Sequence, residues 1–179
     1  MPKNDNAHAL RLKTAIQIAA GEEEANRFTE KYLLSKSANI SQKHQWACDI
    51  CKALQEQFPC EAASIRRACH CGDGKTMARE MLTCFQKAES LALGCELFSE
   101  KSKYAFLEYI SDHELIFGYH SCVCSCIKRA EGPIPLLFCE CSAGYAAAMF
   151  RQVFGDAVQV TLLDSVKNGA ERCTFHIQW

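Results

Sequence analysis

The sequence has no long apolar run and no excess of either charge, and each absence excludes a class of protein. Lys and Arg number 20 against 21 Asp and Glu, and the two signs are interspersed along the chain. No basic region therefore exists to attract phosphate backbones or anionic lipid, so we expect no nucleic-acid partner. No apolar stretch approaches the roughly 20 residues that a bilayer requires, so we expect no membrane insertion.

An export signal is also missing from the start of the sequence. Residues 10–20 form only a short apolar stretch, which Arg11, Lys13 and Gln17 interrupt. A secretory signal has a charged segment followed by an unbroken apolar one, so this pattern predicts a cytoplasmic protein. The length of 179 residues and the 49% of apolar residues are typical of one globular domain.

Cysteine, by contrast, is abundant, with thirteen in the chain. Thiols stay reduced in the cytoplasm, and an odd number cannot all be paired within one chain. We therefore expect these cysteines to be buried apolar groups, metal ligands or reactive thiols.

The first half of the sequence has the apolar spacing of helices. An acidic restart after Gly21 suits the beginning of a second helix, and Ser41 is the expected N-cap of a third, which Pro59 ends. Two glycines, Gly72 and Gly74, predict a tight turn before the next helix. We expect helices at residues 8–20, 22–34, 42–58, 62–68 and 75–97.

In the second half the apolar period changes from 3.6 to two, which is typical of strands. Residues 104–110 and 114–120 predict one hairpin, and residues 158–166 and 173–178 predict another. Ser142 is the expected N-cap of a helix between them, at residues 143–154. The fold class is therefore α+β, with N-terminal helices (residues 1–98) packed on an antiparallel sheet of two hairpins separated by a helix (residues 104–179).

The densest group of candidate ligands lies between His120 and Cys141. Thiolates and imidazoles bind zinc, and thiolates hold iron–sulfur clusters. Alternate residues of a strand lie about 7 Å apart, so one ion requires the backbone to bend after Cys122 and the pair beyond the Pro133 loop to fold back. We expect zinc or an iron–sulfur cluster, although buried thiols without metal explain the same pattern. The candidate ligands are His120, Cys122, Cys124, Cys126, Cys139 and Cys141.

Other cysteines have less specific surroundings. Cys69 and Cys71 flank His70 at the glycine turn and are a second candidate ligand pair. Cys48 and Cys51 form a C-x-x-C pattern in the middle of a predicted helix, which favours core packing over redox chemistry. A structural role on an apolar face is expected for Cys60, Cys84, Cys95 and Cys173.

Cys141 directly precedes the expected helix start at Ser142. Free N–H groups and the helix dipole stabilise a thiolate or a bound anion at such a position. Cys141 is therefore a candidate nucleophile, with Glu140, or else His120 or His70, as the proton carrier. At the same helix start, we expect Ser142, Gly144 and Tyr145 to face a ligand.

Residues 138–177 resemble the C-terminal half of two related families. The run Phe-Cys-Glu-Cys-Ser-Ala-Gly-Tyr, a helix ending at Phe-Gly and a hairpin with Gly169, Cys173 and Phe175 in a Gly-x-x-x-Cys-x-Phe pattern carry the resemblance. The families are the L-2-amino-thiazoline-4-carboxylic acid hydrolase-like proteins and the 4-vinyl reductase-like ligand-binding domains. The resemblance implies the α+β fold shared with nitric-oxide-sensor and Golgi-tethering domains, which binds small or lipidic ligands between helices and sheet.

Three functions follow as hypotheses. The first is a cysteine-rich domain that binds a metal and a small molecule. The second is a hydrolase that opens a small cyclic amidine or amide of the thiazoline type, using metal-bound water or the Cys141 thiolate. The third is an interaction protein whose thiols are only buried. The sequence leaves the oligomeric state open, with a homodimer as one candidate.

Overall fold

The computed structural model describes residues 6–179, which form two compact units. Unit 1 contains residues 6–70 and Cys124–Cys141, and unit 2 contains Cys71–Val123 and Ser142–Trp179. Each unit is therefore built from two separate stretches of chain. The absence of an export signal was read partly from residues 1–5, which lie outside the described residues. That the whole chain is a single domain stays a prediction.

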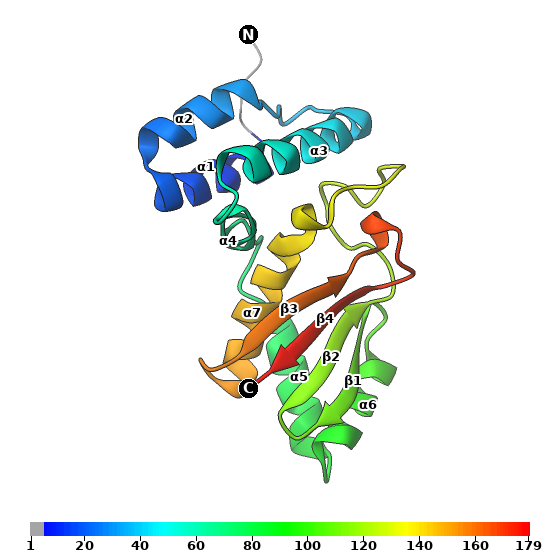
Figure 1. Cartoon of the computed structure of the whole chain (residues 1–179). Helices are drawn as coiled ribbons and strands as arrows, with labels where there is room; N and C mark the ends of the chain where they lie inside the picture. The colour runs from blue at the N-terminus through cyan, green and yellow to red at the C-terminus, as the bar shows by residue number, and fades with distance from the viewer. Residues whose placement is uncertain (1–5) are drawn as a thin grey trace. The chain divides into compact units, whose positions relative to one another are not determined.

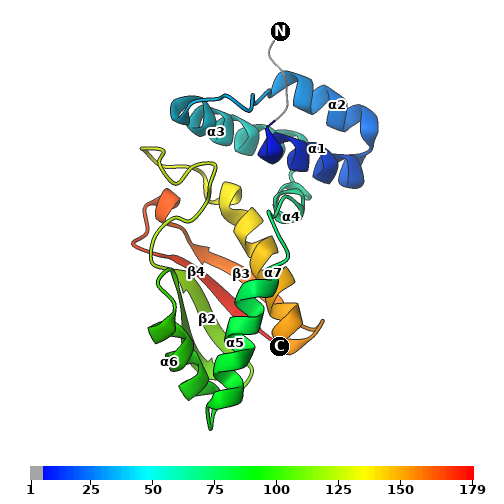
Figure 2. The ribbon, with the colours of Figure 1, turned by 180° about the vertical axis from the view of Figure 1, so that it is seen from behind.

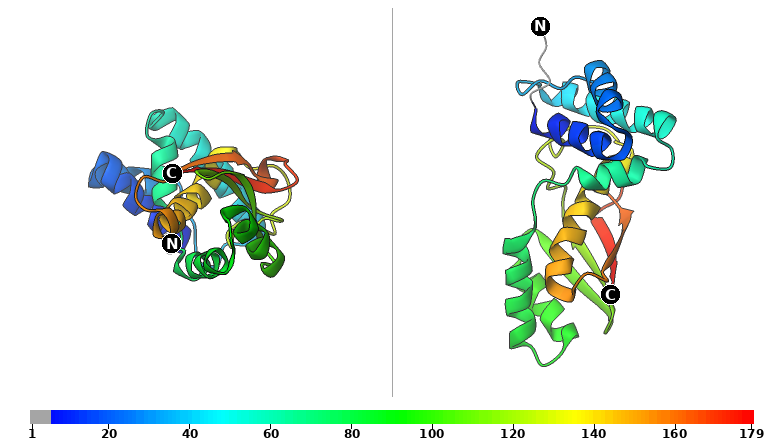
Figure 3. Two further views of the ribbon diagram at one scale, coloured as in Figure 1. Left: turned by 90° about the horizontal axis from the view of Figure 1, so that it is seen from below. Right: turned by 90° about the vertical axis from the view of Figure 1, so that its left-hand side faces the viewer.

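Unit 1 is helical. Helix α1 packs against α2 and α4, and the short 3-10 helix η1 packs against α3 and α4 (Figure 1, Figure 3). Buried side chains such as Leu12 and Ile16 of α1 and Ile50 and Leu54 of α3 fill the interior. Helical spacing puts these apolar residues on one side of each helix, as the sequence predicted. The elements are α1 (Ala7–Ala20), α2 (Glu22–Lys31), α3 (Ile40–Gln57), α4 (Ala62–Ala68) and η1 (Leu136–Cys139).

The N-cap of α3 differs from the prediction. Asn39 caps this helix, because its side-chain oxygen accepts a hydrogen bond of 2.9 Å from the backbone N–H of Gln42. The side chain of Gln42 in turn accepts from the backbone N–H of Asn39, also at 2.9 Å. This reciprocal pair is a capping box with Asn at its first position. The predicted cap, Ser41, lies inside the first turn.

Unit 2 contains a four-stranded antiparallel sheet with the strand order β1-β2-β4-β3. Both predicted hairpins are present, joined along the sheet by the pairing of β2 with β4, for example Phe117 opposite Phe175. The α+β fold class is therefore confirmed. The elements are α5 (Lys75–Lys87), α6 (Leu91–Lys101), β1 (Ala105–Ser111), β2 (Glu114–Tyr119), α7 (Glu140–Phe154), β3 (Gln159–Asp164), η2 (Val166–Asn168) and β4 (Cys173–Gln178).

Helices α5 and α7 cover one face of this sheet, and α6 lies beside β1 (Figure 2). The covered face carries Phe117 of β2 and Phe175 of β4, whose rings lie 5.8 Å apart. Phe150 of α7 packs edge-on against Phe117 at 5.3 Å. Strand side chains alternate between the two faces, so Thr174 and His176 occupy the less buried face.

The single helix predicted at residues 75–97 is wrong, because the chain forms two helices there. Helix α5 ends at Lys87, and Ser90 caps α6 by accepting a hydrogen bond of 3.3 Å from the backbone N–H of Leu93. The two helices pack closely at Gly94, where an added Cβ would lie 2.5 Å from a ring carbon of Phe85. Both helices bury an apolar stripe, so the 3.6-residue period continues across the break and conceals it.

The start of α7 also differs from the prediction. The helix begins at Glu140, directly after η1, so Ser142 lies within it and is not its N-cap. Cys141 is consequently a first-turn residue of α7. The end of the helix at Phe154, followed by Gly155 with a φ of 91°, agrees with the prediction.

Within residues 6–179, none of the helices has the length and apolar character needed to cross a bilayer.

Candidate functional site

A buried arginine, Arg66 of α4, lies at the centre of unit 1. Its side chain is held in place by Phe138 of η1, whose carbonyl oxygen accepts a hydrogen bond of 2.7 Å from Nη2 of Arg66. The guanidinium carbon also lies 4.4 Å from the centre of the Phe138 ring. Trp46 of α3 packs edge-on against the same ring. Together these contacts fix the position of the guanidinium group.

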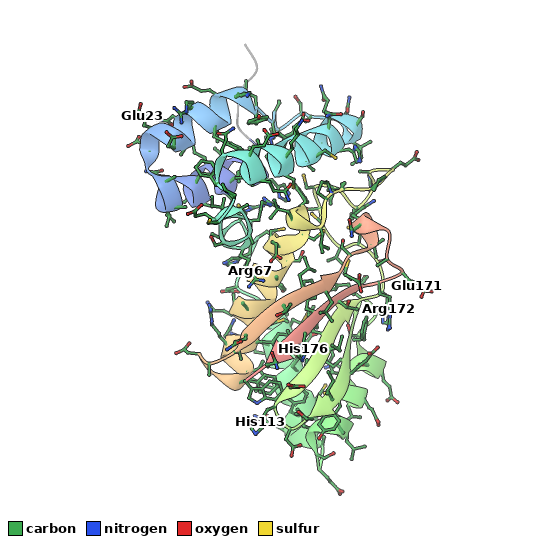
Figure 4. The ribbon with its side chains drawn as sticks, viewed as in Figure 1. Glu23, Arg67, His113, Glu171, Arg172 and His176 are labelled. Carbon is green, nitrogen blue, oxygen red and sulfur yellow. The ribbon has the colours of Figure 1, made fainter. Side chains whose placement is uncertain are left out.

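Arg66 has no acidic partner within residues 6–179. Its residue is only 3% exposed, yet no Asp or Glu forms an ion pair with it in the described part of the chain. Its Nε is buried and has no hydrogen-bond partner. The next residue, Arg67 (labelled in Figure 4), is more exposed and pairs with Glu140 at 2.7 Å. Unit 1 therefore keeps an uncompensated positive charge in its interior, which is costly unless an anion balances it.

Five cysteines of unit 1 are electrostatic neighbours of Arg66, and we call them the thiol cluster. They come from four places in the sequence: α3, the C-cap of α4, and the segments before and after Pro133. Both sides of the Pro133 loop contribute to this group, with Cys124 before the loop and Cys141 after it. That these thiols converge on one centre stays a prediction. The members are Cys51, Cys69, Cys124, Cys126 and Cys141.

Four of these thiols are held in the protonated form. Burial raises the pKa of Cys51 and of Cys124 to about 12 and that of Cys126 to about 11, and it also raises the pKa of Cys69. The neighbouring Cys141 also raises the pKa of each of the four, whereas Arg66 lowers the pKa of Cys51, Cys69 and Cys126. Cys141 is thus the common electrostatic neighbour of the other members.

Further cations surround the thiol cluster. Arg11 of α1 donates a hydrogen bond of 3.2 Å from Nε to the carbonyl oxygen of Cys69, and its Nη2 lies 3.0 Å from Nδ1 of His8. Because an arginine can only donate, Nδ1 of His8 is the acceptor and carries no proton. Burial, followed by the charges of Arg11, Arg66 and Lys43, lowers the pKa of His8 to about 4. The interior of unit 1 is therefore electropositive.

Several predicted site residues belong to unit 2 rather than to the thiol cluster. His120 is exposed and its ring lies 5.1 Å from that of Phe106, and Cys71 is exposed as well. Cys122 is half-buried. In α7, Gly144 is buried, and burial raises the pKa of the half-buried Tyr145. A ligand contact for Ser142, Gly144 and Tyr145 stays a prediction.

Cys139 and Glu140 lie in unit 1 with the thiol cluster. Cys139 is the last residue of η1 and is half-buried. Glu140 opens α7, where its carboxylate is held by Arg67. Its role as a proton carrier for Cys141 stays a prediction.

The prediction of zinc or an iron–sulfur cluster is wrong. In residues 6–179, no three His, Cys, Asp or Glu side chains are arranged to hold a metal ion. The physical reason is that the thiols gather around a guanidinium group, whose positive charge repels a metal cation. The hydrolase hypothesis stays a prediction. The rejected ligand set is His120, Cys122, Cys124, Cys126, Cys139, Cys141, Cys69 and Cys71.

The remaining cysteines mostly follow the prediction. Cys84, Cys95 and Cys173 are buried, as expected of structural residues. Cys60 is exposed in the turn after α3, so its predicted burial is wrong. On the other sheet face of unit 2, Arg172 pairs with Glu108 at 2.9 Å, and Nε2 of His176 lies 3.7 Å from a carboxylate oxygen of Glu114 (Figure 4).

Unit 1 has two surface hollows. One, of about 380 Å³, is lined by residues of 31–49, including Trp46 and Asp49. The other, of about 370 Å³, lies between the start of α3 and residues 129–131. Neither hollow is lined by a cysteine or by any other predicted site residue.

Among solved structures, the chain is similar to H-NOX domains from Shewanella oneidensis. One, solved by NMR in the Fe(II)CO ligation state, is 13% identical, with 97% of each chain covered and a TM-score of 0.44. Another, a crystal structure in the Fe(II)NO ligation state, is 15% identical, with 97% of this chain and 98% of that chain covered and a TM-score of 0.45. No curated protein matches the sequence.

A family profile matches nearly the whole sequence. It is described as a family of unknown function, DUF6144, and the match extends over residues 6–179. This range contains both units and every member of the thiol cluster, together with Arg66. The chain therefore belongs to the DUF6144 family.

Proposed function

We propose that unit 1 binds a small molecule through an acidic group, a carboxylate or a phosphate, which Arg66 recognises. The observation that carries this proposal is the buried guanidinium group of Arg66, whose Nε donates to no protein atom and which has no acidic partner in the described residues. An isolated buried charge carries an effective penalty of several kcal/mol, which an anionic ligand would offset.

The guanidinium group is already positioned for such a ligand. The hydrogen bond to the Phe138 carbonyl oxygen and the stacking on the Phe138 ring fix the Arg66 side chain before any ligand arrives. A fixed donor loses little conformational entropy on binding, so more of the interaction energy remains as affinity. Hydrogen bonds between a guanidinium and a carboxylate or phosphate are also among the strongest in proteins.

The surroundings favour a negative ligand as well. Arg11 and Lys43 act electrostatically on His8 and on Cys126, alongside Arg66. Glu140, the residue before Cys141, is held by Arg67. Cys124, Cys139 and Cys141 are each half-buried, so part of this region is open to solvent. We expect the ligand to be small, because the guanidinium group itself is almost fully enclosed.

Calorimetric titration of the reduced protein tests the proposal. The probes are acetate, benzoate and inorganic phosphate, with acetamide and benzamide as uncharged counterparts of the two carboxylates. We expect saturable binding of at least one anion and none of the amides. The anion that binds distinguishes a carboxylate ligand from a phosphate ligand.

The variant Arg66→Met retains the length of the side chain without its charge, and Arg79→Met is the matched control on the exposed surface of α5. Removing a buried charged partner typically weakens binding by 2–5 kcal/mol, so we expect at least a tenfold loss of affinity in Arg66→Met and no change in Arg79→Met. Circular dichroism checks that both variants fold. Equal anion binding in the wild-type protein and in Arg66→Met would refute the proposal.

A further inference from the structure

The two edges of the sheet in unit 2 differ in how their backbone groups are satisfied. The strand order makes β1 one edge and β3 the other (Figure 1). At the β1 edge, the Ser99 hydroxyl of α6 accepts a hydrogen bond of 2.8 Å from the N–H of Leu107 and lies 3.0 Å from the carbonyl oxygen of the same residue. The Ser102 hydroxyl accepts from the N–H of Ala105 at 3.1 Å. Helix α6 and its C-cap therefore close the β1 edge at these two residues.

Strand β3 directs its outer backbone groups outward at Val160 and Leu162. The N–H of Trp179 donates to the carbonyl oxygen of His113, so odd-numbered residues of β4 bond toward β2 and even-numbered ones toward β3. The β3 partners of those even-numbered residues are odd-numbered, such as Thr161, which leaves Val160 and Leu162 facing the other way. Within residues 6–179, no protein group hydrogen-bonds to the outward N–H and C=O of these two residues.

Strand β3 also lacks the features that keep an edge strand from pairing. Natural edge strands carry charged residues or proline, or are covered by another element. Residues 157–163 contain neither a charged residue nor a proline. The side chain of Leu163 is apolar and exposed. An uncharged edge rich in β-branched residues, with outward backbone groups left over, is a surface that accepts a further strand.

We propose that β3 pairs antiparallel with β3 of a second copy of this chain, so that the two sheets join into one. This inference concerns unit 2 and does not rest on anion binding by unit 1. With Thr161 on the two-fold axis, Val160 of each copy lies opposite Leu162 of the other. Residues that direct their N–H and C=O outward form the hydrogen-bonded pairs of an antiparallel ladder, so this register gives every outward group of Val160 and Leu162 a partner.

The side chains of β3 are compatible with their own two-fold image. Thr161 meets Thr161 of the second copy, and cross-strand threonine pairs are favourable. Gln159 lies opposite Leu163, which is thereby covered. The one charged residue of β3, Asp164, lies opposite Val158, so no like charges of the two strands meet. A two-fold contact uses the same surface of both copies, and α6 closes the other edge, so the assembly ends at a dimer.

Sedimentation velocity of the reduced full-length protein tests this inference, at protein concentrations from about 1 to about 100 µM. We expect the mass of the wild-type protein to rise from that of one chain to that of two, and no further. Thr161→Lys places like charges opposite each other on the axis and should weaken dimerisation by about tenfold or more. Ile110→Lys adds the same charge at an exposed position of β1 and is the matched control, which should dimerise as the wild-type protein does.

An exchange of charges identifies the register. Thr161→Lys and Thr161→Glu should each stay monomeric alone at concentrations where the wild-type protein dimerises, whereas an equimolar mixture should form a dimer with one chain of each. Amide hydrogen exchange gives a second readout, because the amides of Val160 and Leu162 should exchange several-fold more slowly in the wild-type dimer than in Thr161→Lys. Circular dichroism checks that the variants fold.

Four results would overturn the inference. They are a wild-type protein that stays monomeric, a mass that exceeds two chains, dimerisation of Thr161→Lys at the wild-type concentration, and a mixture of the two charge variants that stays monomeric. Each result concerns β3 alone, so it is distinguishable from a failure of anion binding at Arg66.

Discussion

Arg66 and Arg67 are neighbours in one short helix, yet their surroundings differ completely. Arg67 is partly exposed and pairs with Glu140, whereas Arg66 is buried and has no acidic partner in the part of the chain that the structure describes. The sequence contains a signal for this difference. Ala62, Ile65 and Cys69 form an apolar stripe at helical spacing, and Arg66 lies on the same stripe. A charged residue on the buried side of a helix is the pattern that identifies the centre of this site.

The stability of Arg66 variants follows from that burial. Arg66→Met removes an unpaired buried charge and retains most of the volume, so we expect it to match or exceed the wild-type free energy of unfolding in buffer without added anions. Arg66→Ala also removes the packing on Phe138 and should lose about 2–4 kcal/mol. Urea unfolding measures both. If both variants lost the same unfolding free energy, the charge of Arg66 itself would stabilise unit 1.

His8 predicts a pH dependence of stability. Its pKa is about 4 in the folded protein against 6.5 for an ordinary histidine, because of burial and of Arg11, Arg66 and Lys43. Between these values the unfolded chain binds a proton that the folded chain does not, so stability falls as the pH drops from 7 to 5.5. We expect the urea midpoint of the wild-type protein to fall over this pH range and that of His8→Gln to fall by less. An identical pH profile in the variant would assign the effect to other groups.

At the scale of the elements, local patterns predicted most of the fold. Both hairpins were predicted because strands alternate every two residues, and the α4 segment was predicted at residues 62–68, where the helix lies. The errors arose where one backbone interaction decides a boundary: the cap at Ser90 that separates α5 from α6, and η1, which moves the start of α7 to Glu140. The spacing of apolar residues does not depend on such interactions, so it could not locate these helix boundaries.

The N-terminus of α3 offers a direct comparison of two candidate caps. Asn39→Ala removes the acceptor for the Gln42 N–H and should cost about 1 kcal/mol of unfolding free energy. Ser41→Ala, two residues later and exposed, should change it by less than about 0.5 kcal/mol. Urea unfolding of the two variants decides between the caps. A larger loss in Ser41→Ala would restore the cap that the sequence first indicated.

The site itself was only partly predictable from the sequence. The sequence made a fold-back across the Pro133 loop a condition for binding one ion, and it thereby singled out Cys124, Cys126 and Cys141, which are electrostatic neighbours in unit 1. The sequence did not predict that Cys51 belongs to the thiol cluster. Its place on an apolar stripe indicates a core residue whether or not a site is near. The nature of the centre was also hidden, since a cluster of thiols looks the same in sequence around a metal ion and around a guanidinium group.

For the whole molecule, the single-domain prediction can be tested through the two tryptophans, one in each unit. Trp46 of unit 1 donates to the carbonyl oxygen of Tyr32, and Trp179 of unit 2 stacks on Phe154. Each unit is built from two stretches of chain, and α7 contributes residues to both, so we expect the units to unfold together. Fluorescence of Trp46→Phe and Trp179→Phe should then give coincident urea transitions. Two separate midpoints would show independent domains.

The role of Arg66 as an anion-binding group is the claim that the account depends on most, and NMR observes it directly. The Nε–H resonance of Arg66 is assigned by its loss in Arg66→Met, and the reduced wild-type protein is then titrated with acetate, benzoate and phosphate. We predict a saturable shift of this resonance with at least one anion and no shift with acetamide or benzamide. A resonance that does not move with any of the three anions, up to 10 mM by the order of magnitude expected for weak binding, would contradict the account.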